Sequence, residues 1–232
     1  MKKILVIAPI MPQPQEIESI KDWLSFLAAD YSIDVLDPLT VVSSEGSNEE
    51  YYQTWRRKLL GYLSTHDAFF GFSLGGVILQ QCLSVFNLTN KPIVLFSTPT
   101  IADSSLLTNL GDVIRLCQQN QLQNALMRLY EPVLYPNKPP TTFNVENESL
   151  ALTRLISGLQ RVLETDSTAI LNETVVNHLH LIGAHSQLVN INNVMAPKTG
   201  RLLLVPDAGM RVLQDNEAFC KKMVLAALND DI

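Results

Sequence analysis

A serine flanked by glycines is the first place in this sequence where chemistry is expected. Residues 71–75 read Gly-Phe-Ser-Leu-Gly, with Ser73 at the centre. When such a G-x-S-x-G pattern lies on a sharp strand-to-helix turn, the serine hydroxyl can attack an acyl carbon. The N–H of Leu74, at the start of the following helix, can then donate to the developing oxyanion. A second interpretation stays open, in which the glycines serve packing and Ser73 is a small turn residue.

A nucleophilic serine needs a base within hydrogen-bonding distance, and the base needs an orienting group. The four histidines are His66, His178, His180 and His185. We expect the first three near the amino ends of strands, where a hydrogen-bonded structural histidine is the common case. His185 should follow the carboxyl end of its strand, with Asp207 in the next loop. His185 could therefore act as base and Asp207 as its orienting carboxylate, or both could be solvated loop residues.

The elements that must position these residues alternate along the chain. Short, continuous apolar runs predict strands buried on both faces at 4–8, 33–36, 68–72, 92–97, 178–183 and 201–205. Helical spacing of apolar residues occupies 16–29, 50–64, 75–86 and 216–228. This alternation predicts an α/β fold with a mostly parallel central sheet and helices on both faces.

One region breaks the alternation. Between residues 103 and 174 we find helical stretches at 105–119, 120–130 and 148–164, and a proline-rich link at 131–140. We therefore predict a single domain over 1–232 with a helical cap inserted at 103–174. Some of its apolar residues could roof an acyl pocket over Ser73, among Leu106, Leu107, Leu110, Ile114, Leu122, Leu126, Met127, Leu155 and Leu159.

With the sequence GFSLGG, the helical insertion and the C-terminal VPDAGMRVLQDNEAF, the chain resembles the α/β-hydrolase superfamily over nearly its whole length. The cap length and the stretch GLQRVLETDSTAIL (158–171) make it look most like the pimeloyl-acyl-carrier-protein methyl ester esterases of biotin synthesis. This resemblance implies a carboxylesterase-type serine hydrolase with Ser73 as nucleophile.

The chain departs from that family at the two partners of the serine. Ser186 stands where the family has its aspartate, and Met210 stands where it has its histidine. After the first strand, Pro9 has no N–H to offer, but Ile10 or Met11 could still donate, and Ile10 is the candidate for the second oxyanion donor beside Leu74. The nucleophile position is kept, while the usual base and acid are absent.

Four arginines lie in the helical insertion: Arg115, Arg128, Arg154 and Arg161. In the resembled esterases, cap arginines dock an acidic carrier protein, and a guanidinium suits phosphate and carboxylate. Arg154 and Arg161 should share one helix face. The alternative is that all four are ordinary exposed residues of amphipathic helices.

Composition restricts the remaining possibilities. The net charge is −6 and no run of lysine and arginine occurs, which argues against nucleic acid and anionic membranes as partners. The three cysteines are widely spaced and suit reduced, structural thiols in a cytoplasmic protein. No spacing typical of a metal site occurs, and we expect neither metal nor cofactor. The lysines and short apolar run at the N-terminus favour a first strand over a signal peptide.

Three hypotheses follow. The first is a serine hydrolase acting on an ester or thioester of an acyl chain, free or bound to acyl carrier protein. The second is a catalytically degenerate relative that binds an acyl ligand or a protein partner without turnover. The third is a structural or regulatory subunit. Because the base and acid are missing from their usual positions, the sequence does not decide whether the protein is an enzyme.

Overall fold

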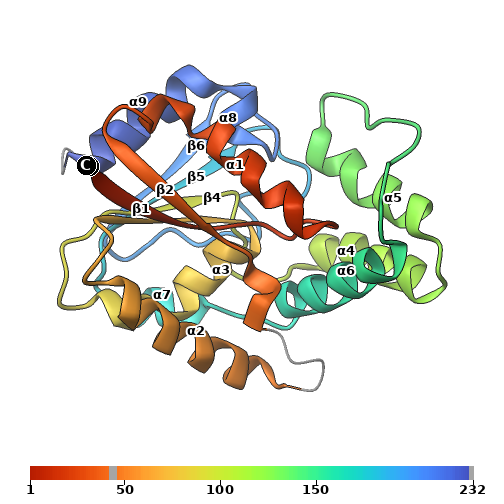
Figure 1. The fold of residues 1–232 in the computed structure, drawn as a ribbon, viewed down its shortest axis with the longest axis horizontal. Helices are drawn as coiled ribbons and strands as arrows, with labels where there is room; N and C mark the ends of the chain where they lie inside the picture. Colours follow the sequence, from red (N-terminus) through yellow and green to blue (C-terminus); the bar gives the residue numbers. More distant parts are fainter. Residues whose placement is uncertain (42–45, 230–232) are drawn as a thin grey trace.

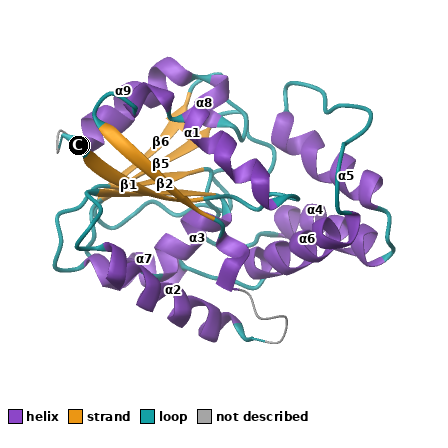
Figure 2. Ribbon diagram, in the orientation of Figure 1, coloured by secondary structure: helices purple, strands orange, loops and turns teal. Residues whose placement is uncertain are grey.

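The computed structural model describes residues 1–41 and 46–229, which fold around a six-stranded sheet of order β2-β1-β3-β4-β5-β6. The strands are β1 (Lys2–Ile7), β2 (Tyr31–Leu36), β3 (Ala68–Phe72), β4 (Ile93–Phe96), β5 (His178–Gly183) and β6 (Gly200–Val205). Every pairing is parallel, so all carboxyl ends meet at one edge (Figure 2). Each predicted apolar run forms a strand, and the predicted fold class is confirmed. Burial on both faces was wrong for β2 and β6, which are only partly buried because they lie at the edges of the sheet.

Helices cover both faces of the sheet (Figure 1). On one face lie α2 (Asn48–Tyr62), α3 (Leu74–Gln81) and α7 (Thr168–Glu173), and on the other α1 (Ile20–Trp23), α8 (Val212–Asp215) and α9 (Glu217–Leu228). Successive strand residues point to opposite faces, so each face has its own core. Phe69 packs with Trp55 on the α2 face, and Phe70 packs with Val224 on the α9 face.

Three helices of the insertion gather beyond the carboxyl ends of the strands (Figure 1). They are α4 (Ser104–Gln118), α5 (Leu122–Leu134) and α6 (Glu148–Leu163), and α4 packs against both others. Asp103 caps α4 by accepting from the Leu106 N–H at 2.8 Å, and Asn147 caps α6 by accepting from the Leu150 N–H at 2.9 Å. Helix α5 continues into the predicted proline-rich link and includes Pro132. These helices stand over the edge where the candidate residues lie.

The segment predicted as one helix at 16–29 is divided. The chain forms a 3₁₀ turn, η1 (Pro14–Ser19), then α1, then a second 3₁₀ turn, η2 (Ser25–Leu27). Leu24 leaves helical torsion angles, with φ −109° and ψ 15°, and ends α1. Ile20, Leu24 and Leu27 are nevertheless buried. The apolar spacing therefore predicted which residues are buried, but the prediction of one continuous α-helix was wrong. Two further 3₁₀ turns are η3 (Pro38–Val41) and η4 (Leu83–Phe86).

The predicted structural role of the cysteines fits the structure, since Cys82, Cys117 and Cys220 are all buried and free. Burial raises the pKa of the Cys82 thiol to about 12, so this thiol stays protonated and inert. Among the described residues, no helix is both long enough and apolar enough to cross a membrane.

Candidate active site

Ser73 occupies a strained turn between β3 and α3, and we call this turn, residues 71–75, the elbow. Its torsion angles are φ 49° and ψ −113°, in a region that residues other than glycine rarely adopt. Its N–H donates to the Phe96 carbonyl of β4 at 3.0 Å, which ties the turn to the neighbouring strand. The sharp strand-to-helix turn expected from the sequence is therefore present, and it lifts Ser73 to the carboxyl edge of the sheet.

The glycines after Ser73 are required by close packing. A Cβ on Gly75 would lie 2.1 Å from the carbonyl oxygen of Ile7 in β1. A Cβ on Gly76 would lie 1.8 Å from Oγ1 of Thr98 after β4. Helix α3 thus begins in contact with two strands, and the packing interpretation of these glycines holds whether or not Ser73 reacts.

The two predicted oxyanion donors are available. Leu74 is the first residue of α3, so its N–H has no partner within the helix. Over residues 1–41 and 46–229, neither the Leu74 N–H nor the Ile10 N–H donates to a protein acceptor. Ile10 lines the same cavity as Ser73. Both N–H groups can therefore hydrogen bond to an oxygen atom of a bound molecule.

That cavity has a volume of about 430 Å³ and lies between the sheet edge and the insertion. Most of its lining is apolar, with Ile10, Met11, Trp23, Phe72, Phe96, Leu106, Leu110, Leu129, Val133, Leu159, Val162, Leu188, Val189 and Met210. Of the predicted roof residues, Leu106, Leu110 and Leu159 line it, while Leu107 is exposed. Glu16 and Arg211 are the charged residues among those described in the lining. The cavity suits a mainly apolar ligand.

Met210 stands at the position where the resembled family has its histidine. It lines the cavity together with Ser73, and its carbonyl oxygen accepts a hydrogen bond from Ser97 Oγ at 2.6 Å. A thioether is a weak hydrogen-bond acceptor and takes no proton at neutral pH. In the described part of the chain, no group hydrogen bonds to Ser73 Oγ, and no histidine lines the cavity. Ser73 is left without an activating partner there.

The structure brings His185 and Asp207 together, but outside that cavity. Nε2 of His185 lies 3.9 Å from Oδ1 of Asp207, and the side chains are 62% and 93% exposed. The His185 N–H donates to the Ala208 carbonyl at 2.9 Å, which joins the loops after β5 and β6. Neither side chain is part of the lining that contains Ser73. Ser186, at the acid position, is buried, and its Oγ has no partner among the described residues.

The other histidines have structural surroundings, as expected. Nε2 of His66 lies 3.0 Å from a carboxylate oxygen of Asp34. Burial lowers the pKa of His178. Burial, and then the nearby His178, lower the pKa of His180 to about 3, so its imidazole is neutral. Its Nε2 accepts from the Thr98 N–H at 3.2 Å, directly below the elbow. His180 therefore supports the turn from inside the core.

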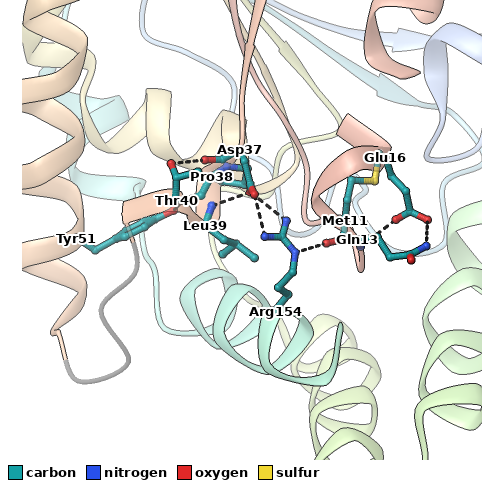
Figure 3. Close-up of polar contacts among 9 residues, drawn as sticks. All are labelled: Met11, Gln13, Glu16, Asp37, Pro38, Leu39, Thr40, Tyr51 and Arg154. Atoms are coloured by element: carbon teal, nitrogen blue, oxygen red, sulfur yellow. Dashed lines mark hydrogen bonds and ion pairs between the residues drawn. The ribbon is translucent and has the colours of Figure 1, made fainter. Parts of the chain in front are cut away.

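Arg154 of α6 is buried, which differs from the expectation of a surface arginine that could dock a carrier. Its guanidinium makes a bidentate contact with Asp37 at 2.8 and 3.1 Å, and its Nε donates to the Met11 carbonyl at 2.8 Å (Figure 3). These three hydrogen bonds fix α6 to the loops after β1 and β2.

Arg161 is buried as well. As predicted, Arg154 and Arg161 lie on one face of α6. Arg161 donates to Asn48 Oδ1 at 2.6 Å and lies over the Tyr51 ring, 5.1 Å from its centroid. Arg115 and Arg128 remain more exposed and share the carboxylate of Asp112, each at 3.3 Å. Only these two guanidinium groups are open to a partner at the surface of the insertion.

Sequence reasoning missed two residues that the structure makes prominent. Asp37 was not considered, although it is the buried counterion of Arg154. Arg211, directly after Met210, shows no sequence signal of its own, yet it lines the cavity. A group of three or more His, Cys, Asp or Glu side chains able to hold a metal ion is not found among residues 1–41 and 46–229.

Similar solved structures include hydrolases. An α/β hydrolase enzyme, MGS-M2, from a Medee basin deep-sea metagenome library has a TM-score of 0.73 at 10% identity, covering 98% of this chain and 89% of that one. The hydrolase olei00960 from Oleispira antarctica has a TM-score of 0.71 at 12% identity, covering 99% and 91%. An esterase from Exiguobacterium antarcticum has a TM-score of 0.68 at 13% identity, covering 98% and 92%.

No protein-family model matches the sequence, and no curated protein matches it either. At identities this low, structural likeness shows the fold alone. The chain has the α/β-hydrolase fold, and what it does must be argued from its own residues.

Proposed function

We propose that this protein binds an apolar small molecule in the cavity above Ser73 and does not cleave it through that serine. The observation that carries the proposal is that Met210, a thioether, lines the cavity that contains Ser73, while no histidine among the described residues does. Without a base, a serine hydroxyl stays protonated and is a poor nucleophile. The free N–H groups of Leu74 and Ile10 then serve to hold an oxygen of the ligand.

The shape and lining of the cavity support binding. Its volume of about 430 Å³ falls within the range of small-molecule sites, and its few polar groups can orient a ligand in a mainly apolar space. Burial of an acyl chain or an aromatic ring there would be driven by the apolar area removed from water. Trp23 lies in the lining, whereas Trp55 is fully buried in the α2 core. Tryptophan fluorescence should therefore respond to a ligand through Trp23.

Calorimetry with octanamide and octanoate, together with Trp23 fluorescence, tests the proposal. Leu106 and Leu107 offer a matched pair, because Leu106 lines the cavity while Leu107 is 47% exposed. Leu106→Trp should fill the cavity and weaken binding by at least about tenfold, since it removes room for an apolar chain. Leu107→Trp should bind like wild type. Failure of wild type to bind either probe would overturn the proposal.

A second candidate function is a serine esterase or thioesterase acting on an acyl chain, free or carried by an acidic carrier protein, as in the pimeloyl esterases that the sequence resembles. The pairing of His185 with Asp207 at 3.9 Å, at the same sheet edge as Ser73, favours it. A loop movement would have to bring His185 to Ser73. Arg115 and Arg128 would then be the arginines that meet the carrier.

Hydrolysis of p-nitrophenyl octanoate separates the two candidates. Cleavage that is lost in both Ser73→Ala and His185→Ala, and reduced in Asp207→Asn, would establish the esterase and refute binding without turnover. Absence of cleavage by wild type, with octanamide bound, would refute the esterase. If the esterase is established, charge reversal at Arg115 and Arg128 should affect the hydrolysis of a carrier-bound substrate and not that of a free one.

A further inference from the structure

Arg211 presents an unsatisfied guanidinium at the cavity. It follows Met210 directly, lines the same cavity as Ser73, and its side chain is 32% exposed. Its Nε is buried and has no hydrogen-bond partner. Among the described residues, none accepts a hydrogen bond from its guanidinium, and its one ion pair is loose, 3.7 Å from Nη2 to Asp215 Oδ1. A guanidinium has five N–H donors, and none of those of Arg211 makes a hydrogen bond to another described residue.

The contrast with Arg154 shows that this is not how the protein treats arginines in its interior. Arg154 has three hydrogen bonds to Asp37 and Met11, none longer than 3.1 Å. A buried donor left unpaired destabilises the folded state, so an unpaired one at a cavity indicates a partner that comes from outside the chain.

The nearby carboxylates leave Arg211 with a loose ion pair to Asp215 and no hydrogen bond to either carboxylate in the described part of the chain. Asp215 is already engaged, because its Oδ2 accepts from the Gly209 N–H at 2.9 Å. Glu16, the other charged lining residue, accepts at its two oxygens from the backbone and side-chain N–H groups of Gln13, each at 3.1 Å. These bonds partly offset the charge of Glu16, and among the described residues no ion pair joins it to Arg211. An incoming anion would thus meet the guanidinium as its main partner.

We propose that the ligand of this cavity carries a carboxylate, which binds Arg211 while its apolar part occupies the space over Ser73. This inference rests on the proposed function. Arg211 lines the cavity with its side chain partly exposed, so its guanidinium is available to a carboxylate bound there. Arginine is the side chain best shaped for a bidentate, fork-to-fork contact with a carboxylate.

The test compares octanoate with octanamide, which have the same chain and differ in head-group charge. Affinities are measured by calorimetry at neutral pH for wild type, Arg211→Gln, Arg211→Lys and the control Arg115→Gln, whose side chain is 56% exposed on α4. Wild type and Arg115→Gln should prefer octanoate. Arg211→Gln should lose about tenfold to a hundredfold in octanoate affinity while octanamide affinity stays within about threefold, because only the charged head group loses its partner. Arg211→Lys should retain part of the preference.

Equal affinity of wild type for octanoate and octanamide would overturn this inference and leave the proposed function standing. So would an Arg211→Gln variant that still prefers octanoate. Binding of neither probe by wild type would remove the proposed function and this inference with it. Unchanged octanamide binding in Arg211→Gln shows that the cavity is intact, so a folding defect cannot imitate the expected result.

Discussion

The loop after β3 and the loops after β5 and β6 lie at the same edge of the sheet, but they differ in which features of a serine hydrolase they contain. After β3, Ser73 has its strained torsion angles and Gly75 its backbone contact with Ile7. After β5 and β6, Ser186 has an unpartnered hydroxyl and Met210 a thioether. Packing between strand and helix fixes the first loop whether or not chemistry occurs. Only a catalytic role would fix an imidazole and a carboxylate in the other two.

The largest expected effect is at the elbow. Gly75→Ala should lower the free energy of unfolding by about 3 kcal/mol or more, at the upper end for overpacked sites, because its Cβ meets the backbone of β1 at 2.1 Å. Urea unfolding measures this.

Gly61→Ala is the matched control. Gly61 lies inside α2 and its Cβ would meet nothing within 4 Å, so the change should be neutral or stabilise by up to about 1 kcal/mol. If Gly75→Ala were as stable as wild type, packing would not be what preserves the elbow.

The next effect concerns pH and the support beneath the elbow. The pKa of His180 is about 3 in the folded protein and near 6.5 when unfolded. Between these values the unfolded chain binds the extra proton, so the stability present above pH 6.5 is lost as pH falls. The slope approaches about 1.4 kcal/mol per pH unit, or about 2 kcal/mol by about pH 5.

Urea unfolding at about pH 7 and about pH 5 checks this against His180→Gln, whose amide oxygen can still accept from Thr98 but does not titrate. Between about pH 7 and about pH 5, the His180→Gln variant should lose about 2 kcal/mol less stability than wild type. The same pH dependence of stability in both proteins would show that the pKa of His180 is not lowered in the folded protein.

The smallest effect is expected at the former acid position. Ser186→Ala should change the free energy of unfolding by less than about 1 kcal/mol, or raise it, because the buried Oγ makes no hydrogen bond to a described residue that would be lost. A cost above about 2 kcal/mol would mean that this hydroxyl has a structural partner and that the loop is fixed by more than chemistry.

The strands could be predicted because parallel strands are continuous apolar runs, a local property of the sequence, whereas the partial exposure of β2 and β6 follows from their places at the edges of the sheet. The elbow could be predicted for the same reason, since strand, glycines and helix are adjacent in the chain. The replacement of base and acid by Met210 and Ser186 was also visible, and the structure places Met210 in the cavity as that replacement implies.

The arginines could not be predicted in the same way. Arg154 reads as a surface residue until Asp37, 117 positions away, is found against it in the fold. Arg211 reads as one charge in a loop until its donors are seen to be unused at a cavity. Burial and pairing of a charge depend on tertiary neighbours, which periodicity and composition do not contain.

The most direct test of the central claim is covalent labelling of Ser73 by a fluorophosphonate probe between about pH 6 and 9, where a catalytic imidazole would become neutral. Wild type is compared with a control serine hydrolase, with Ser73→Ala as the blank, and with Met210→His combined with Ser186→Asp. We predict that wild type stays unlabelled while the control labels fully, and that the double variant labels at least about a hundredfold faster than wild type. Labelling of wild type at the rate of the control, abolished in Ser73→Ala, would contradict the account.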